Sequence, residues 1–443
     1  MRSILDMNAF HPEDLDGIED PAIKTETQRR LRLFGAPAVL FFKQPIEVER
    51  GEGSYLITAN GERYLDCYNN VACIGHAHPK VAEYVKEQLL KVNTHTRYLN
   101  RVVDDYAEKL LDTFPKPLTN IALTCTGTES NDLALRMAMY FTGGKGIIVT
   151  DGAYHGNSYL VTMCSPSATK GKTTSEFVKT VPAPDTYRIQ KDELAKKFAA
   201  DIEQKIKEFE AEGIKFAALI IDDIFSSDGV FADPQGFLKP AIDTVHRYGG
   251  LYIADEVQPG FGRTGVMWGF MRHGVLPDIV TMGKPMGNGY PMSAAVTRPE
   301  ITEVLAKSTG YFNTFGGSPA AAAAGTAVLE VLKEDDLIAK AGETGDYLRA
   351  GLKALMSEHP CIGDVRGAGL FTGLELVKDR QSKEPDGELT SLIVNRLCHH
   401  HVLIGCAGKA GNTLKIRPPL RFDKKDADVF LEAFKLSLND LGV

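Results

Sequence analysis

The sequence predicts an α/β protein with a mostly parallel sheet that is covered by helices. Strand-like apolar runs alternate with helical periods through the middle of the chain, which is typical of parallel sheets with helices on both faces. The 443 residues also exceed the usual size of a single domain, so we expect two domains. The two segments that flank the middle differ from it and have hairpin-like and mixed patterns.

The strands of this sheet can be placed one by one. Apolar runs indicate strands at residues 121–125, 146–150, 217–221, 251–254 and 279–282, and helical periods lie at 129–140, 191–212 and 239–246. Active sites of such sheets lie at the carboxyl ends of the strands. Residues 126–128, Asp255 and Lys284 each come at the end of an apolar run, so we expect them at one edge of the sheet.

The flanking segments carry local signals of their own. The Asn60-Gly61 pair is typical of a hairpin turn between two short strands. Residues 321–332 are rich in good helix formers and predict a long helix. Further strands are expected within GLFTGLELV at 369–377 and NTLKIRPPL at 412–420. The C-terminal tail is therefore predicted to be mixed α+β.

The composition excludes several classes of protein. A net charge of −8 argues against a nucleic-acid partner, which would need a basic face. No apolar run is long enough to span a membrane, and the N-terminus lacks the order of a signal peptide. Seven scattered cysteines fit reduced thiols better than a disulfide framework. We therefore expect a cytoplasmic enzyme that binds neither nucleic acid nor membrane.

Asp255 and Lys284 stand in the two most informative segments, GLYIADEVQPGFGRTG at 250–265 and PDIVTMGKPMGNG at 277–289. Most aspartates and lysines are solvated surface groups, so neither residue is informative alone. A lysine and a carboxylate displayed together at strand ends suit one cofactor, pyridoxal phosphate (PLP). The lysine would form the Schiff base, and the carboxylate would keep the ring nitrogen protonated.

The chain resembles the class III aminotransferase family of fold-type I PLP enzymes. The resemblance rests on the two segments above and on four more in the family's order: 61–81, LTCTGTESNDLALRMA at 123–138, GAYHG at 152–156 and NTFGGSPAAAAAG at 313–325. It implies the fold of a fold-type I PLP-dependent transferase. It also implies a large PLP-binding domain at 64–325 and a small domain formed by 1–63 and 326–443.

The resemblance also implies a cofactor site. Its residues would be Gly127, Thr128, Tyr154, His155, Asp255, Val257, Gln258, Lys284 and Thr314. Gly127 and Thr128 open a helix whose N-terminus favours a phosphate, although an ordinary helix cap would look the same. Tyr154 would stack on the ring, and Val257 would pack beneath it. Gln258 would reach the phenolic oxygen, and His155 would lie nearby without transferring a proton.

Thr314 matches a residue that reaches the phosphate bound by a neighbouring protomer. The resemblance therefore implies a homodimer with shared active sites.

Two other motifs are not expected to carry function. Residues 260–265 satisfy GxGxxG, but no helical period follows, as a dinucleotide site would require. Residues 398–401 read Cys-His-His-His, yet consecutive residues on a regular element cannot all face one ion. No metal site is expected, and the second motif is interpreted as a helix end.

The chain departs from the aminotransferase pattern where carboxylate substrates would be recognised. Lys415 stands where typical members carry an arginine, and lysine cannot form the planar bidentate fork on a carboxylate. The family's EPxQGEGG segment is replaced by residues 222–229, with Ser227 in place of the second glutamate. Both halves of the arginine–glutamate pair that handles two carboxylate substrates are therefore missing.

These departures resemble the branch of PLP-dependent phospho-lyases that act on O-phosphoethanolamine or 5-phosphohydroxylysine. The likeness rests on CYNNV at 67–71, NTHTRYL at 93–99 and LKIRPPL at 414–420. A substrate phosphate needs cations and hydrogen-bond donors. The candidates in these segments are Tyr68, Asn70, Arg97, Lys415 and Arg417, each of which could equally be a structural or surface residue.

The expected reaction eliminates phosphate from O-phosphoethanolamine to give acetaldehyde, ammonia and phosphate, with Lys284 as the general base. The alternative is a class III ω-aminotransferase that transfers an amino group from an amine or amino acid to a 2-keto acid. A catalytically silent PLP-binding protein is a third interpretation, and intact Asp255 and Lys284 argue against it. The sequence leaves the choice between phosphoethanolamine and phosphohydroxylysine open.

Overall fold

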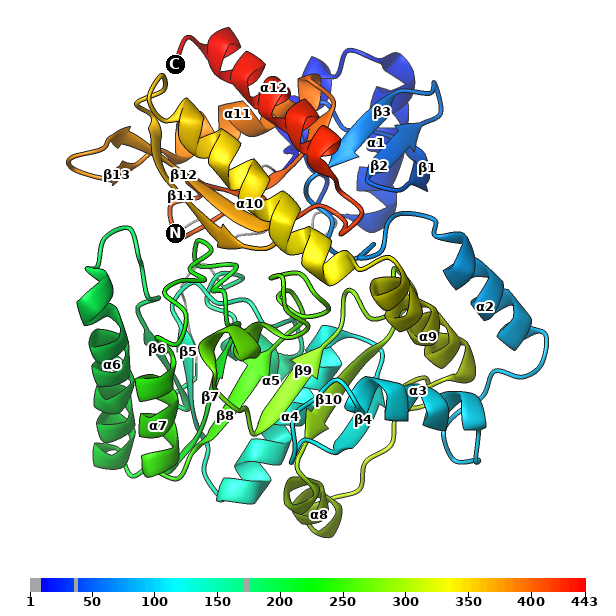
Figure 1. Cartoon of the computed structure of the whole chain (residues 1–443), viewed down its shortest axis with the longest axis vertical. Helices are drawn as coiled ribbons and strands as arrows, with labels where there is room; N and C mark the ends of the chain where they lie inside the picture. The colour runs from blue at the N-terminus through cyan, green and yellow to red at the C-terminus, as the bar shows by residue number, and fades with distance from the viewer. Residues whose placement is uncertain (1–8, 36–38, 170–174) are drawn as a thin grey trace.

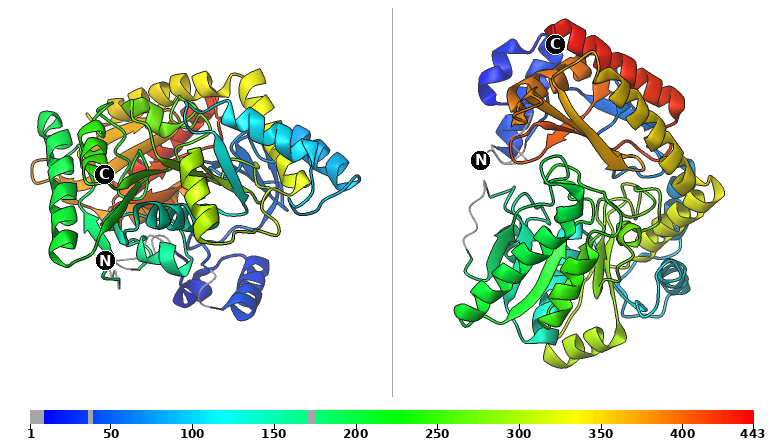
Figure 2. Two further views of the ribbon diagram at one scale, coloured as in Figure 1. Left: turned by 90° about the horizontal axis from the view of Figure 1, so that it is seen from below. Right: turned by 60° about the vertical axis from the view of Figure 1, so that its left-hand side comes forward.

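A computed structural model describes residues 9–35, 39–169 and 175–443. It confirms the predicted α/β fold, with a large helix-covered sheet below and a smaller α+β layer above it (Figure 1). Helices α9 (Pro319–Glu334) and α10 (Leu337–Leu355) lead from the lower part to the upper part, as the turned views also show (Figure 2).

The large sheet has seven strands in the order β4-β10-β9-β8-β7-β5-β6. Their bounds are β4 Asn120–Thr124, β5 Gly146–Thr150, β6 Val178–Val181, β7 Phe216–Ile221, β8 Leu251–Asp255, β9 Ile279–Met282 and β10 Ser293–Thr297. All neighbours from β9 to β6 run parallel, whereas β10 is antiparallel to both β9 and β4. The five predicted strands are confirmed to within one residue at each end, but β6 and the antiparallel strand β10 were not predicted.

Helices cover both faces of this sheet. Helix α4 (Gly127–Thr142) packs on β7 to β10 and on α8 (Pro299–Ser308), whereas α6 (Lys191–Ala211) and α7 (Lys239–Arg247) cover the other face. Successive residues of a strand point to opposite faces, so Ile147 packs with the α4 side and Ile148 with the α6 side. Burial on both faces explains why β7 is apolar throughout.

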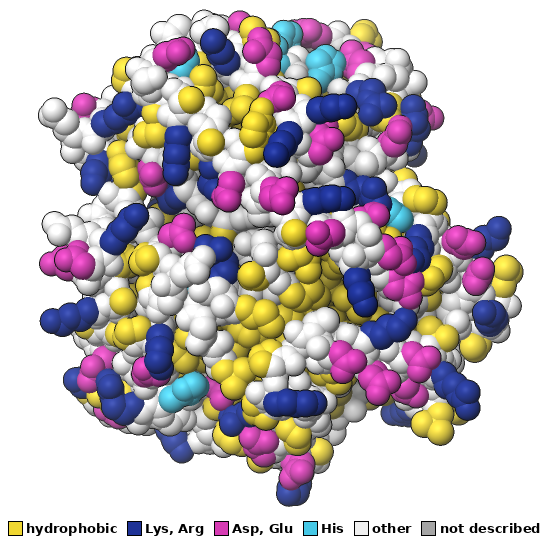
Figure 3. All heavy atoms as spheres, viewed as in Figure 1, with side chains coloured by type: hydrophobic (Ala, Val, Ile, Leu, Met, Phe, Trp, Pro, Cys, Tyr) yellow, Lys and Arg dark blue, Asp and Glu magenta, His cyan; other side chains and the backbone are white. Residues whose placement is uncertain are grey.

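The lower part has four further helices among the described residues. They are α2 (Pro79–Leu89), α3 (Arg101–Leu111), α5 (Tyr159–Met163) and the 3₁₀ helix η2 (Gly269–His273). Helices α2 and α3 both pack against α9, where the expected helix at 321–332 is confirmed. On the face shown in Figure 3, basic and acidic side chains are interspersed.

The upper part joins the two ends of the chain. Strands β1 (Val48–Glu52), β2 (Tyr55–Thr58) and β3 (Arg63–Asp66) form an antiparallel sheet, and β14 (Val402–Leu403) adds to β3 in parallel. The predicted hairpin turn at Asn60-Gly61 connects β2 and β3. The N-terminal segment and the C-terminal tail therefore share one sheet.

A second sheet and three helices complete the upper part. The sheet holds β11 (Ile362–Ala368), β12 (Phe371–Asp379), β16 (Thr413–Ile416) and β15 (Gly405–Ala407), with the short β13 (Glu384–Pro385) paired to β12. Helices α10, α11 (Gly387–His399) and α12 (Lys424–Leu441) pack together on it. Strand β16 ends earlier than expected because Pro418 and Pro419 have no N–H for the ladder. An N-terminal arm holds η1 (Pro12–Gly17) and α1 (Pro21–Phe34).

The structure also bears on the Cys-His-His-His run set aside above. Helix α11 ends at His399, and His400 Nε2 contacts Asp440 Oδ2 at 2.8 Å. Within the described residues, no group of three or more His, Cys, Asp or Glu side chains is arranged to hold a metal ion. None of the described helices is both long and apolar enough to cross a bilayer.

Candidate active site

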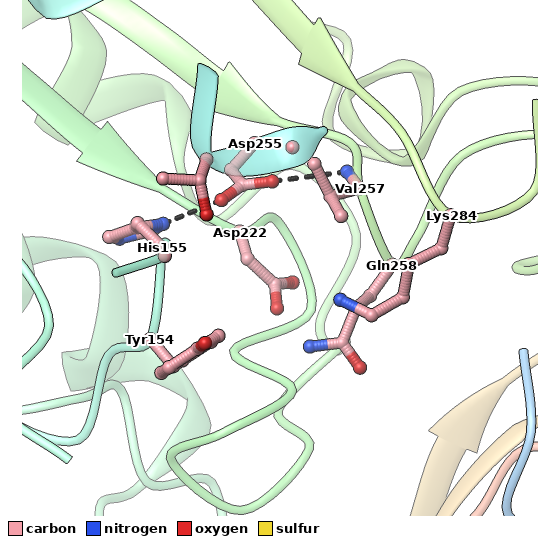
Figure 4. A pocket seen from close by; sticks show the side chains of 10 residues that line it. Tyr154, His155, Asp222, Asp255, Val257, Gln258 and Lys284 are labelled. Carbon is pink, nitrogen blue, oxygen red and sulfur yellow. Dashed lines mark hydrogen bonds and ion pairs between the residues drawn. The ribbon is translucent and has the colours of Figure 1, made fainter. Parts of the chain in front are cut away.

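A cavity with about 500 Å³ of empty space lies at the carboxyl ends of β7, β8 and β9. It is lined by Gly127, Thr128, Tyr154, His155, Gly156, Asp222, Asp255, Val257, Gln258 and Lys284. The fold therefore gathers residues from distant parts of the chain, as expected for strand ends of a parallel sheet. Asp255, His155 and Tyr154 lie on one side, and Gln258 and Lys284 lie on the other (Figure 4).

The start of helix α4 forms one wall of the cavity. Thr126 caps the helix by accepting a hydrogen bond from Glu129 N at 3.2 Å, so Gly127 and Thr128 supply the first helical N–H groups. A Cβ atom at Gly127 would come within 3.0 Å of Val257, and one at Gly156 within 2.5 Å of Thr128 Oγ1. A side chain would press on Val257 at position 127 and would clash with Thr128 at position 156, where φ is also +142°, so the two glycines leave the wall open and it suits a phosphate group.

Asp255 is held at the end of β8 by three donors. Val257 N donates to Oδ1 at 3.0 Å, and Asn131 Nδ2 donates to Oδ2 at 2.9 Å. His155 Nδ1 lies 2.6 Å from the same Oδ2. Asp255 is 4% exposed, so this buried network holds its carboxylate in a fixed position beside the cavity.

Asn131 was not predicted as a site residue. It lies on α4, is fully buried, donates to both Asp255 and the carbonyl of His155, and its own oxygen accepts from Thr281 Oγ1. A polar side chain on the apolar face of a predicted helix is the signal that could have identified it.

His155 contacts Asp255 directly, and its Nε2 atom is buried without a partner among the described residues.

Lys284 follows β9 and points into the cavity (Figure 4). Among the described residues no hydrogen-bond or ion-pair partner of its Nζ is found. Burial of the ammonium, and then the positive charge of Arg417, lower the pKa of Lys284. Asp255 and Asp222 oppose this shift only in part. The amine therefore loses its proton more easily than a surface lysine does.

Asp222 is a second site residue that sequence reasoning missed. It directly follows β7, and its two carboxylate oxygens accept hydrogen bonds from Ile224 N and Ser226 N, both at 3.0 Å. Burial raises the pKa of Asp222, against the effect of these hydrogen bonds and of Lys415. Its place at a strand end, next to a predicted apolar run, was the available signal.

A buried arginine lies beside the cavity. The Arg417 guanidinium carbon is 4.4 Å from the centroid of the Tyr68 ring, and Nη1 donates to Asn70 Oδ1 and Gln258 Oε1, both at 3.3 Å. Gln258 Nε2 in turn donates to Ser226 Oγ at 2.7 Å. Three predicted substrate residues, Tyr68, Asn70 and Arg417, are thus brought together.

This arginine has unused hydrogen-bonding capacity. Arg417 is 8% exposed, and no carboxylate of the described chain lies within ion-pair distance of it. Its Nε atom and Nδ2 of Asn70 are both buried donors that have no partner in the described part of the chain. Unpartnered buried donors are rare, and a buried cation is normally paired. The cluster therefore suits an anion.

Two other predicted substrate residues stay outside the lining of the cavity, one buried near it and one exposed. Lys415 is 3% exposed, and its Nζ lies 5.6 Å from the centroid of the Phe371 ring. Burial and then Arg417 lower the pKa of Lys415 well below its usual value, against the effect of Asp222. Arg97 is exposed, with its guanidinium carbon 4.0 Å from the centroid of the Phe312 ring. Neither side chain lines the cavity.

Thr314 also lies outside the cavity of its own protomer. It is exposed on the surface beside Phe315, which is 74% exposed. The expected contact of Thr314 with a second protomer's phosphate, and that of Gln258 with a phenolic oxygen, stay predictions.

Comparison with known proteins finds one matching family model and several similar proteins. The model of the family described as aminotransferase class-III matches residues 41–438. An "alanine–glyoxylate aminotransferase 2-like" protein of Drosophila melanogaster is 40% identical over 427 residues, which cover 93% of this chain and 86% of the relative. An "ethanolamine-phosphate phospho-lyase homolog 1" of Caenorhabditis elegans is 37% identical over 420 residues, covering 90% of each protein.

Solved structures give a similar result. A phospholyase from Arthrobacter, solved in complex with phosphoethanolamine, is 40% identical in sequence and superposes with a TM-score of 0.90. The match covers 94% of this chain and 99% of that structure.

Proposed function

Because this chain belongs to the class III aminotransferase family, we propose that it is a PLP-dependent phospho-lyase acting on O-phosphoethanolamine. The reaction consumes water and yields acetaldehyde, ammonia and phosphate. The relatives are divided between phospho-lyases and aminotransferases, so the choice rests on the chain's own residues.

The cofactor of this family is PLP, and the cavity suits it. Gly127 and Thr128 would hold its phosphate, Tyr154 and Val257 would contact the two faces of its ring, and Asp255 would face the ring nitrogen. When bound, PLP supplies an electron sink for negative charge that develops at the substrate carbon next to the amine. The close approach that glycine permits at positions 127 and 156 supports this placement.

The observation that carries the proposal is the buried Arg417 with no carboxylate partner in the described chain. Its Nε and Asn70 Nδ2 supply two unused donors for a phosphate, next to the lysine that does the chemistry. A substrate without a carboxylate also explains how the site can lack the family's arginine at position 415. The substrate phosphate is therefore assigned to Arg417, Asn70 and Tyr68.

Lys284 and Arg417 would then have separate roles in the reaction. Lys284 Nζ, with its lowered pKa, takes a proton from the carbon next to the substrate amine. Arg417 and Asn70 hold the phosphate while its bond to the neighbouring carbon breaks, and they stabilise the charge that collects on it. Asp255, held by His155 and Asn131, would contact the ring nitrogen at the opposite end of the site.

A class III aminotransferase remains the second candidate. It is favoured by the relative from Drosophila melanogaster and by the human mitochondrial alanine–glyoxylate aminotransferase 2, which is 36% identical over 432 residues. Against it stands Lys415, which the fold buries over Phe371 and whose pKa burial and Arg417 lower, and which lacks the planar fork of a carboxylate-binding arginine.

One experiment separates the two functions. The purified holoenzyme is incubated with O-phosphoethanolamine, without any keto acid, and inorganic phosphate and acetaldehyde are measured. The lyase releases both in equal amounts over many turnovers. An aminotransferase releases neither: it would stop after one half-reaction, which leaves the substrate as a phosphorylated aldehyde, and would resume only when pyruvate or glyoxylate is added. Parallel assays with 5-phosphohydroxylysine decide between the two phosphorylated amines.

We further propose that the working unit is a homodimer in the cytoplasm. Support for the dimer comes from the exposed Thr314 and from apolar side chains near it and on the segment around Arg97, with Leu99 100% and Phe315 74% exposed. Large exposed apolar side chains gathered in this way are typical of interfaces.

A further inference from the structure

Behind the cavity, the fold buries a second pair of acids. Asp222 and Asp255 end the neighbouring strands β7 and β8 and line the cavity. The residues that follow them, Asp223 and Glu256, are fully buried, and their carboxyl groups lie within hydrogen-bonding reach of each other. Asp223 stands where the family segment EPxQGEGG has proline, so this pair is not inherent in the family pattern.

The surroundings of the pair supply no positive charge. Glu256 accepts hydrogen bonds from Gly269 N at 2.8 Å and Phe270 N at 2.9 Å, both in η2. Asp223 Oδ1 accepts from the hydroxyl of Tyr252, and the Asp223 carbonyl accepts from His273 Nε2 at 3.1 Å. Burial lowers the pKa of His273 to about 4, so this ring is neutral.

The other charged groups nearby do not neutralise the pair either. Asp222 adds a further negative charge, whose effect reaches both carboxyl groups. Arg272 is engaged with Asp233, at 2.9 Å between Nη2 and Oδ1. Two carboxylates in contact, fully buried and without a cation, would each carry a large desolvation cost.

A single proton resolves this conflict. Asp223 Oδ2 is buried, and as an ionised carboxylate oxygen it would have no hydrogen-bond donor among the described residues. Protonated there, it would donate to Glu256, which already accepts two backbone N–H bonds and is therefore the better anion. In other proteins, too, two carboxyl groups in contact share one proton, because ionising both of them would be costly.

We propose that Asp223 and Glu256 share one proton and act as positioning residues that fix the ends of β7 and β8, and with them Asp222 and Asp255. The link joins the residue after Asp222 to the residue after Asp255, so it ties together the two strand ends that carry the cavity's carboxylates. Through Glu256 it also anchors η2. This inference is independent of the substrate.

The pair should make folding stability depend on pH. Burial raises the pKa of Glu256 to about 7 and that of Asp223 well above its usual value. A raised folded-state pKa contributes stability that is fully present below the unfolded-state value and is lost as the pH rises through the folded-state value. The folded protein keeps a proton that the unfolded chain releases, so this contribution falls from about pH 4 to at least about pH 7.

The test compares thermal unfolding of the holoenzyme for wild type, Asp223→Asn and Glu256→Gln across this pH range. Asn imitates protonated Asp223, so we expect D223N to fold, to match wild type at low pH, and to gain in Tm over it as the pH rises. At position 256 the side-chain NH2 group of Gln would face one of the two backbone N–H groups from which Glu256 accepts. E256Q should therefore have a lower Tm than wild type at every pH. The exposed Asp243, paired with Lys239, supplies the control D243N.

Infrared spectroscopy tests the proton directly. At neutral pH the protonated-carboxyl absorption of wild type should lose one component in D223N and keep it in D243N, while other buried carboxyl groups such as Asp228 contribute equally to all three proteins. The shared proton is disproved if the difference in Tm between D223N and wild type stays constant across the pH range. It is also disproved if D223N retains all of the wild-type protonated-carboxyl absorption. If E256Q is as stable as wild type, the proton does not reside on Asp223 and the anchoring of η2 through Glu256 is disproved.

Positioning predicts one more readout. The pH dependence of the bound cofactor's absorbance should be unchanged in D223N and altered in E256Q, because only the latter disturbs the strand end that carries Asp255. An unchanged absorbance profile in E256Q would leave Asp255 independent of the pair and overturn the positioning role.

Discussion

His155 Nδ1 lies 2.6 Å from Asp255 Oδ2, and both side chains are buried at the end of strand β8. The histidine therefore acts on the site through the carboxylate that would face the ring nitrogen of PLP. This assigns His155 a positioning role, in keeping with the expectation that it transfers no proton.

His155→Ala should lower kcat by about 10- to 150-fold, because a hydrogen bond to a charged group is worth roughly 1.5–3 kcal/mol. His155→Asn should recover much of this loss, since its amide can still donate to Asp255. Steady-state phosphate release measures both. Equal activity in H155A and wild type would show that Asn131 and Val257 N hold Asp255 without help.

Lys284→Ala should abolish turnover and the yellow colour of the bound cofactor, while the fold stays intact. The lysine has no structural partner among the described residues, so its removal breaks no hydrogen bond there. Absorbance and circular dichroism of the purified variant check the two halves of this prediction. The control is Lys415→Ala, which removes a neighbouring buried lysine and should leave the colour unchanged. A colourless K415A protein or an active K284A protein would contradict the assignment.

Arg417→Leu should raise KM for O-phosphoethanolamine by about 10- to 150-fold, since the phosphate loses a charged donor. Arg417→Lys should recover the loss only in part, because lysine cannot reproduce the planar fork. The matched control is Arg97→Ala, an exposed arginine that stacks on Phe312. If R97A raises KM more than R417L does, the substrate phosphate lies at Arg97, which could reach the site only from a second protomer.

Lys415→Ala should have a smaller effect on KM than Arg417→Leu has. The sequence offered Lys415 as one of five candidate ligands of the phosphate, but burial and then Arg417 lower its pKa well below the usual value. A drop in kcat/KM as large as that of R417L would mean that substrate binding recharges Lys415. The pH dependence of KM would then show an added ionisation that K415A lacks.

Asp228→Asn should stabilise the protein increasingly as the pH is raised from about 4 to about 7. Burial, and then the charge of Asp151, raise the pKa of Asp228 to about 7. A raised folded-state pKa gives stability at low pH that is lost as the pH rises through that value. The carboxylate accepts from Thr150 Oγ1 and Gly152 N, and an Asn side chain can keep the second bond. Thermal unfolding against pH checks this, and a constant difference in Tm between D228N and wild type would refute it.

Thr314→Ala should weaken cofactor retention, and the wild-type protein should sediment as a dimer. Both follow if Thr314 contacts the phosphate bound by a second protomer. Dialysis of the holoenzyme followed by absorbance measures retention. A fully active monomer would rule out shared sites.

The sequence by itself determined the fold class, the cofactor and most of the cavity. Asp255, Lys284 and Gly127 could be placed because each follows an apolar run, and the ends of parallel strands meet at one edge. Local composition fixes such strands, so their bounds were predicted closely, as for β5 and β9.

Only the tertiary structure decided how polar side chains pair. Asn131, Asp222 and the Asp223–Glu256 contact come from segments far apart in the chain, and nothing local shows which of their atoms will be buried together. The same holds for the three basic residues of the substrate segments. The fold buries Arg417 without a carboxylate partner in the described chain, lowers the pKa of Lys415 through desolvation and places Arg97 at the surface, because these properties depend on the burial that packing imposes.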